Sequence, residues 1–200
     1  MRIGKISAVL AAITVSAFAS AASAQEQFSL RASPTILGGN VTFNGSSVNL
    51  QQTTSINCAV GAVLNVIGGA GSATANLTSP SISPGASPFC GILVFPVTPW
   101  SAASQAGQNI TGLTGAPTSA LVTVYVGANT IVGDPCNPQA VTATLTTPAS
   151  ATAPSTLTFN NVVLQAASGR PDRVCRVNGV LTATRPEKRV FIHSHPARGS

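Results

Sequence analysis

The chain has 200 residues, of which only 7% are charged, and its mean hydropathy is +0.35. An ordinary soluble domain carries roughly 25% charged residues, so the composition argues against most intracellular enzymes. The 18 glycines and 14 prolines also argue against long helices, because both residue types interrupt them. We therefore expect a β-rich protein with many turns that works outside the cytoplasm.

The first 24 residues have the pattern of a secretory signal peptide. Arg2 and Lys5 precede an apolar run over residues 6–19, and Ala22-Ser23-Ala24 provides a small-residue cleavage site. The run is shorter than the 20 or so residues that cross a bilayer, which disfavours a membrane anchor. We expect a mature protein that begins near Gln25, has no integral membrane span, and is secreted by a bacterium or displayed on its outer surface.

Charge is concentrated at the C-terminal end of the expected mature chain. Eight cations and four acids follow residue 24, a net charge of +4, yet residues 32–169 carry only Asp134. Residues 185–200 are charged and contain prolines, which is typical of a disordered tail. We expect a solvated tail; the functional alternative is that its cations bind a polyanionic surface. These cations are Arg185, Lys188, Arg189 and Arg198.

Four cysteines lie in the expected exported part: Cys58, Cys90, Cys136 and Cys175. An even number of cysteines in an oxidising compartment predicts two disulfides, but the spacing leaves all three pairings open. The sequential pairing would close loops of about 30 to 40 residues, each of which contributes about 3 to 4 kcal/mol. No CxxC pair is present and both histidines lie far away in the tail, so we expect no metal site.

Alternation of apolar and polar residues recurs through the chain and predicts half-buried strands. Gly, Pro and Asn-Gly or Asp-Pro pairs separate these segments, among them Asn44-Gly45 and Asn178-Gly179, which we expect to form turns. We expect one antiparallel all-β domain over residues 25–184, a β-sandwich or Greek key. The expected strands lie at residues 28–36, 41–43, 47–50, 55–60, 63–67, 73–77, 91–95, 121–126, 141–146, 156–164 and 174–182.

The inventory of reactive side chains argues against an enzyme. Between residues 25 and 169 there is no His and no Lys, and the only acids are Glu26 and Asp134, so no general base lies near the many serines. His193 and His195 belong to the expected tail. We therefore expect no catalytic residue, no cofactor and no nucleic-acid partner. Trp100, the only Trp, is expected in the core, with an exposed apolar anchor as its functional alternative.

Seven short segments follow one another in an order that is characteristic of a known family. They are Ser55-Ile56-Asn57-Cys58, Gly71-Ser72-Ala73-Thr74-Ala75, Phe89-Cys90-Gly91, Pro99-Trp100, Pro135-Cys136, Leu157-Thr158-Phe159-Asn160-Asn161-Val162-Val163-Leu164 and Cys175-Arg176-Val177-Asn178-Gly179-Val180-Leu181. Together they resemble the bacterial protein activator of alkane oxidation family, over about residues 28–184. The resemblance implies a small secreted or surface-associated protein linked to growth on water-immiscible alkanes, adhesion and biofilm matrix, and it implies no catalytic residue.

Physical chemistry and resemblance agree on a non-catalytic role at hydrophobic surfaces. An alkane offers no polar group, so a protein can hold it only through apolar contact. The partners that we expect are alkanes or other hydrophobic surfaces, together with self-association. The alternative is a fimbrial or matrix subunit that polymerises by strand addition, because the alternating residues 28–36 could complete the sheet of a neighbour.

Overall fold

The computed structural model describes residues 25–30, 37–67, 74–92, 94–105, 108, 110, 118–130, 133–150, 152–184 and 189–195; the expected signal segment, residues 1–24, lies outside them. This part contains one short 3-10 helix, η1 (Pro171–Arg173), and no helix with the length and apolar character to span a bilayer. Its strands are β1 (Gln25–Ser29), β2 (Gly39–Gln51), β3 (Ser55–Val66), β4 (Thr74–Pro84), β5 (Val94–Pro96), β6 (Trp100–Ser104), β7 (Thr118–Thr130), β8 (Cys136–Thr147), β9 (Thr156–Leu164), β10 (Cys175–Ala183) and β11 (Phe191–His195).

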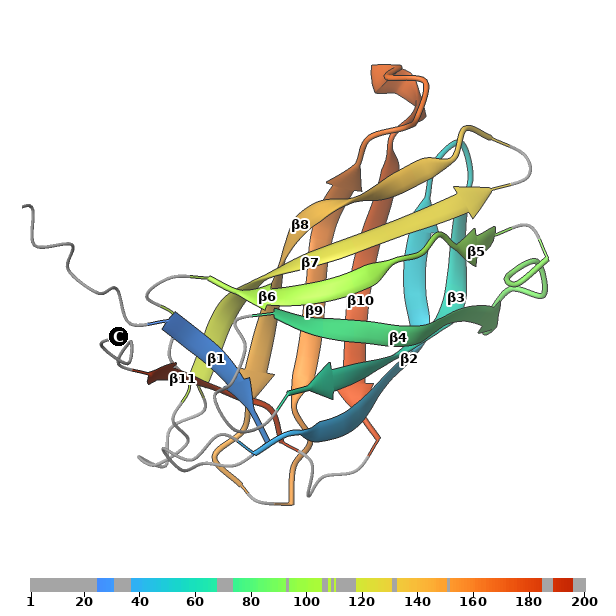
Figure 1. Cartoon of the computed structure of the whole chain (residues 1–200). Coiled ribbons are helices and arrows are strands. Elements are labelled where there is room, and N and C mark those ends of the chain that lie inside the picture. Colours follow the sequence, from blue (N-terminus) through green and yellow to red (C-terminus); the bar gives the residue numbers. More distant parts are fainter. Residues whose placement is uncertain are drawn as a thin grey trace, which may run out of the picture.

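Eight of these strands form a closed barrel (Figure 1). Strands β2, β3, β4, β6, β7, β8, β9 and β10 follow one another round the sheet in chain order, each antiparallel to the next, and β10 pairs with β2. Strand β5 is added beside the end of β7. The predicted antiparallel all-β fold is confirmed, but it is a closed barrel, not a sandwich or Greek key. Alternation specifies which side chains share a face, and it carries no information about whether the last strand meets the first.

The alternating pattern produces the barrel interior. On β7, Val122 and Val124 are buried, whereas Leu121 and Tyr125, which flank them, are exposed. Successive side chains of a strand point to opposite faces, so every second residue faces the axis of the barrel. The inward positions of the other strands include Val41, Phe43, Val48, Leu64, Leu77, Val141, Leu145, Leu157 and Leu181.

Two Asn-Gly pairs that were predicted to form turns lie inside long strands instead. The pairing of β2 with β3 shifts register between Gly45 and Val48, and the pairing of β10 with β9 shifts between Val177 and Gly179. A Cβ atom on Gly45 would lie 2.5 Å from the carbonyl oxygen of Val180 on β10. Glycine is therefore required at this position because two strands approach closely at a bulge, where the sheet bends.

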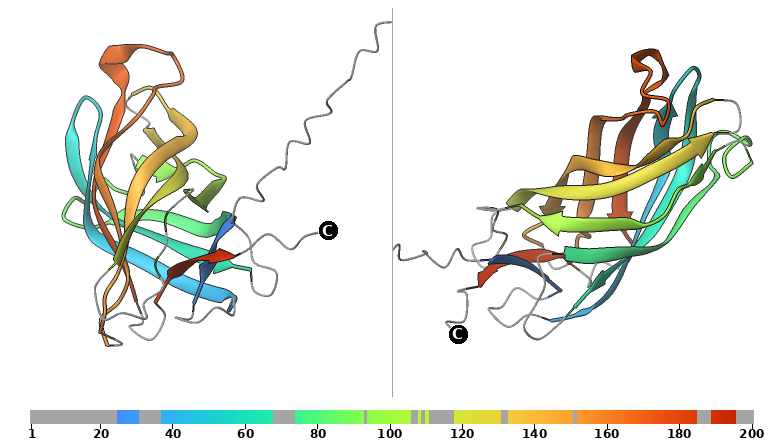
Figure 2. Two further views of the ribbon diagram at one scale, coloured as in Figure 1. Left: turned by 90° about the vertical axis from the view of Figure 1, so that its left-hand side faces the viewer. Right: turned by 45° about the horizontal axis from the view of Figure 1, so that its top comes forward.

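One end of the barrel is covered by the two terminal strands, which we call the terminal ribbon. β1 and β11 pair in antiparallel register, with Phe28 opposite Ile192, and both views of Figure 2 place them together at this end. Phe28, Phe191 and Ile192 are each at most 2% exposed. The hydroxyl of Thr147 on β8 donates to the carbonyl of Val190, which joins the ribbon to the barrel wall. We call this the sealed end.

The terminal ribbon changes the expected picture of both chain ends. Residues 191–195 were expected in a disordered tail, yet they form β11. Val190, Phe191 and Ile192 form a short apolar run, and this run is buried at the end of the barrel. Of the segment considered for strand addition to a neighbour, residues 28 and 29 belong to β1, which pairs with β11 of the same chain. Residues 31–36, 185–188 and 196–200 lie outside the described part.

Candidate functional site

An apolar cavity of about 380 Å³ opens at the end of the barrel opposite to the terminal ribbon. Strand β2 connects the two ends: it begins close to the ribbon, where Leu37 bonds to Leu30, and reaches the cavity at Leu50. We call the open end the mouth. It consists of the turn at residues 52–54, the loop at residues 85–92 and the first residues of β8 and β10. The apolar wall comes from separate strands and the loop: Leu50, Ile56, Phe89, Val94, Ala128 and Val177.

The cavity leads towards the barrel interior. A smaller void of about 40 Å³ shares Leu50, Ala128 and Val177 with it and extends to Trp100 and Phe159. The apolar residues that the two spaces share are inward positions of strands, so they are apolar for the same reason as the core. The turn at residues 52–54 adds polar side chains to the wall of the cavity. A molecule in the cavity would therefore lie directly above the interior of the barrel.

Trp100 is a core residue. It is 8% exposed, and its indole Nε1 donates to the carbonyls of Val97 at 2.8 Å and Gly127 at 3.1 Å. A buried indole needs a partner for its N–H group, and here two backbone oxygens supply it. Trp100 is therefore not among the exposed large apolar side chains of the described residues. Two residues that are, Phe89 and Ile92, lie at the mouth.

Both disulfides brace the mouth. The pairs are Cys58 with Cys90 and Cys136 with Cys175, so the sequential pairing is the one that forms. The first bond attaches the loop at residues 85–92 to β3, and the second joins the start of β8 to the start of β10 across β9. The prediction of two disulfides is confirmed, and their position at one end could not be inferred from spacing alone.

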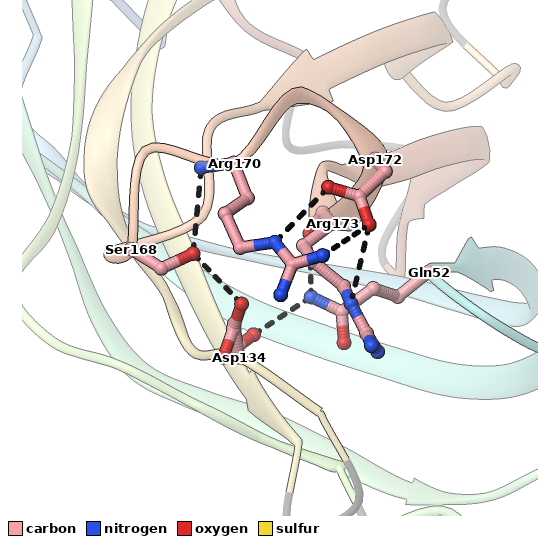
Figure 3. A network of polar contacts seen from close by, with 6 residues as sticks. All are labelled: Gln52, Asp134, Ser168, Arg170, Asp172 and Arg173. Carbon is pink, nitrogen blue, oxygen red and sulfur yellow. Dashed lines mark hydrogen bonds and ion pairs between the residues drawn. The ribbon is translucent and has the colours of Figure 1, made fainter.

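A polar network, with Gln52 at its centre, ties three loops together at the rim of the cavity (Figure 3). The side-chain amide of Gln52 donates to the carbonyl of Asp134 and to that of Arg173, both at 2.7 Å. Ser168 donates to the Asp134 carboxylate at 2.7 Å. The turn after β2, the segment before β8 and the segment before β10 are thus held in one arrangement, which fixes the shape of the mouth.

The network predicts a measurable role for Gln52. Changing Gln52→Met leaves two carbonyl oxygens without their donor, so we expect the free energy of unfolding to fall by about 1–2 kcal/mol in urea denaturation. Gln51→Met is the matched control, because Gln51 is the adjacent exposed residue; its effect should stay within about 0.5 kcal/mol. Equal effects of the two changes would contradict the role assigned to the network.

The charges of the mouth lie on its outer rim. Arg170 contacts Asp172 at 3.0 Å, and Arg173 contacts the same carboxylate at 3.6 Å. The hydrogen bonds from Arg170 hold the pKa of Asp172 below its usual value. Arg170 and Asp172 are more than half exposed and Arg173 is 35% exposed, so solvent screens these pairs and they contribute little to stability. Among the described residues that line the cavity, Arg176 is the one charged residue.

The remaining residues singled out in the sequence lie at the sealed end or outside the described part. The guanidinium of Arg189 lies 5.1 Å from the ring centre of Phe191, and His193 stacks on that ring at 6.1 Å. Arg185, Lys188 and Arg198 are not among the described residues. Within the described ranges, no group of three or more His, Cys, Asp or Glu side chains could hold a metal ion.

Sequence reasoning did not identify the cavity residues. Ile56, Ala128 and Val177 occupy inward strand positions and carry no signal that separates them from the core. The one signal lay in the segments that carry the family resemblance, because Ile56, Phe89 and Val177 belong to three of them. Those segments converge at the mouth only after the barrel closes.

The fold and the cavity define a disulfide-braced, antiparallel barrel protein with one sealed and one open end. The family model of PraA/PraB-like alkane oxidation protein activators matches residues 1–192. The chain therefore belongs to this family, as the resemblance in the sequence indicated. Neither a curated protein nor a solved structure matches the chain.

Proposed function

We propose that the protein supports alkane oxidation without catalysis, by binding alkanes or similar apolar molecules in the cavity at the mouth. The observation that carries this proposal is the cavity of about 380 Å³, open to solvent and lined mainly by apolar side chains of the barrel interior. Its size falls within the range of about 300–1,000 Å³ typical of ligand sites, and barrel mouths are a common place for them.

The chemistry of the wall suits a ligand without polar groups. Binding of an alkane gains roughly 25 cal/mol of free energy for each Å² of its surface removed from water, and an alkane has no polar group that needs a hydrogen-bond partner. Leu50, Ile56 and Val177 offer such contact. The rim network around Gln52 keeps the cavity from collapsing when it is empty, so the site is ready before the ligand arrives.

The place of action belongs to the same proposal. A segment with the pattern of a secretory signal peptide and two disulfides are both compatible with a protein outside the cytoplasm, where alkanes first reach a bacterium. We propose that the protein is secreted or held at the outer surface and that it promotes contact between cells and hydrophobic substrates, including adhesion and biofilm matrix.

A fluorescence titration tests the binding site. N-phenyl-1-naphthylamine, a neutral apolar fluorophore, should bind the purified protein and be displaced by dodecane. The emission of Trp100 should change as well, because this single tryptophan borders the void beneath the cavity. If the fluorophore does not bind, or if dodecane does not displace it, the proposed function is wrong.

A cavity-filling change locates the binding. Val177→Phe places extra volume into the cavity and should weaken binding of the fluorophore at least tenfold. Val180→Phe is the matched control on the same strand, because Val180 is 46% exposed on the outer face and should leave the affinity unchanged. Equal effects of both changes, or none, would place the bound fluorophore outside the cavity.

A further inference from the structure

Two apolar side chains project into solvent beside the cavity. Phe89 is 54% exposed and Ile92 is 66% exposed, the highest value among the large apolar side chains of the described residues. Both belong to one tight turn, residues 89–92, which we call the apolar turn. Phe89 is also part of the apolar cavity wall, so the turn and the cavity together form one apolar surface, and a surface of this kind marks a contact site.

The apolar turn is held rigidly in this position. The amide of Ile92 donates to the carbonyl of Phe89 at 3.3 Å, and that of Gly91 donates to the carbonyl of Val94 at 2.9 Å. Cys90 between them is fully buried and bonded to Cys58. Gly91 has φ +78°, and an added Cβ would lie 3.0 Å from the carbonyl oxygen of Ile82. The backbone therefore keeps both apolar side chains turned outward.

Phe89 connects the apolar turn with the cavity, because it both lines the cavity and faces solvent. A phase that covers Phe89 is therefore also in contact with the wall of the cavity. We propose that the apolar turn inserts into the hydrocarbon at an alkane–water boundary, so that an alkane passes from that phase into the cavity without crossing water. This inference rests on the proposed function and adds the route by which the ligand enters.

The size and charge of the surface favour a hydrocarbon phase as the occupant. A stable interface with a second protein copy buries about 800 Å² per partner, far more than two side chains that are little over half exposed can offer. A hydrocarbon phase needs no matching shape and offers no group for pairing. The loop at residues 85–92, which carries the apolar turn, fits this demand because it contains no charged residue. The charges of the mouth lie on other segments, at Arg170, Asp172, Arg173 and Arg176.

Adsorption to hexadecane droplets tests the inference. The double variant Phe89→Ser/Ile92→Ser should adsorb at least tenfold less than the unchanged protein, because two apolar side chains no longer enter the oil. Leu121→Ser/Val180→Ser is the matched control, since these side chains are 43% and 46% exposed on the barrel wall. Its adsorption should change less than twofold.

A single variant separates this inference from the proposed function. Ile92 does not line the cavity, so Ile92→Ser should bind N-phenyl-1-naphthylamine from solution with unchanged affinity while its adsorption to hexadecane falls. If the unchanged protein binds no fluorophore, the proposed function fails whatever the droplets show. If it binds the fluorophore and Ile92→Ser still adsorbs fully, only the inference about the apolar turn fails.

The same variants also test whether the apolar turn binds something other than a hydrocarbon phase. Equal loss of adsorption in both double variants would show that general surface hydrophobicity drives adsorption, and the inference would be overturned. Binding to phosphatidylcholine vesicles as strong as to hexadecane, and dependent on Ile92, would replace the hydrocarbon by a lipid bilayer. Concentration-dependent dimerisation that Ile92→Ser abolishes would replace it by a second copy of the chain.

Discussion

Changing Phe28→Ala should lower the free energy of unfolding by about 3–5 kcal/mol, the usual cost of removing a buried phenyl ring. Phe28 is 2% exposed and reaches from the terminal ribbon into the end of the barrel, where it borders Phe43, Leu77 and Leu157. Removing the ring leaves a cavity among side chains that β strands on all sides hold in place. Guanidinium denaturation followed by circular dichroism measures the effect.

Phe89→Ala is the matched control for this prediction. It removes the same ring from a side chain that is 54% exposed, so its effect on stability should stay below about 1 kcal/mol. Under conditions where Phe28→Ala is still folded, we expect it to bind N-phenyl-1-naphthylamine, because the cavity lies at the opposite end. A loss of stability below about 1 kcal/mol for Phe28→Ala would show that the terminal ribbon does not seal the barrel.

Local patterns in the sequence predicted most of the barrel strands, but they missed β6 and placed a strand at residues 91–95, where β5 begins only at Val94. Residues 141–146 and 156–164 were expected as strands and lie in β8 and β9, because alternating Thr and apolar residues separate an outward from an inward face. The closure of the sheet depends on β10 meeting β2, which are more than 120 residues apart. The residue pattern within a single strand contains no information about a pairing between strands so far apart in the sequence.

Two further differences have local physical causes. Asn44-Gly45 has the composition of a hairpin turn, yet it lies at a bulge within β2. Glycine is needed there because the backbone of Val180 approaches too closely for a Cβ atom. The C-terminal segment was predicted to be disordered because charged residues and prolines surround the short apolar run Val190-Phe191-Ile192. That run is short, but a strand needs only a few apolar residues when a partner strand and a barrel end are available to cover it.

The candidate site was predictable only in its chemistry. The near absence of charge and the family resemblance both indicated apolar ligands, whereas the position of the site follows from the open end of a closed sheet. Trp100 was expected in the core, with an exposed anchor as the alternative, and the structure buries its ring in the interior and gives its N–H group backbone acceptors. Phe89 and Ile92 are ordinary residues in the sequence, and only the disulfide-braced turn makes them prominent.

Removing the second disulfide by Cys136→Ser/Cys175→Ser should lower the free energy of unfolding by about 4 kcal/mol, since the bond closes a loop with a sequence separation of 39 residues. The variant should also bind N-phenyl-1-naphthylamine more weakly. Cys175 lines the cavity, and its bond holds the starts of β8 and β10 together next to Gln52. Denaturation under non-reducing conditions and the fluorescence titration measure the two effects.

The first disulfide provides the comparison that separates stability from function. Its sequence separation is 32 residues, so Cys58→Ser/Cys90→Ser should lower the free energy of unfolding by a similar amount, about 4 kcal/mol. Because this bond anchors the apolar turn, its loss should in addition reduce adsorption to hexadecane, which loss of the Cys136–Cys175 bond should not do directly. Identical adsorption of the two folded variants would mean that the anchor at Cys90 has no part in docking, even if both variants are equally destabilised.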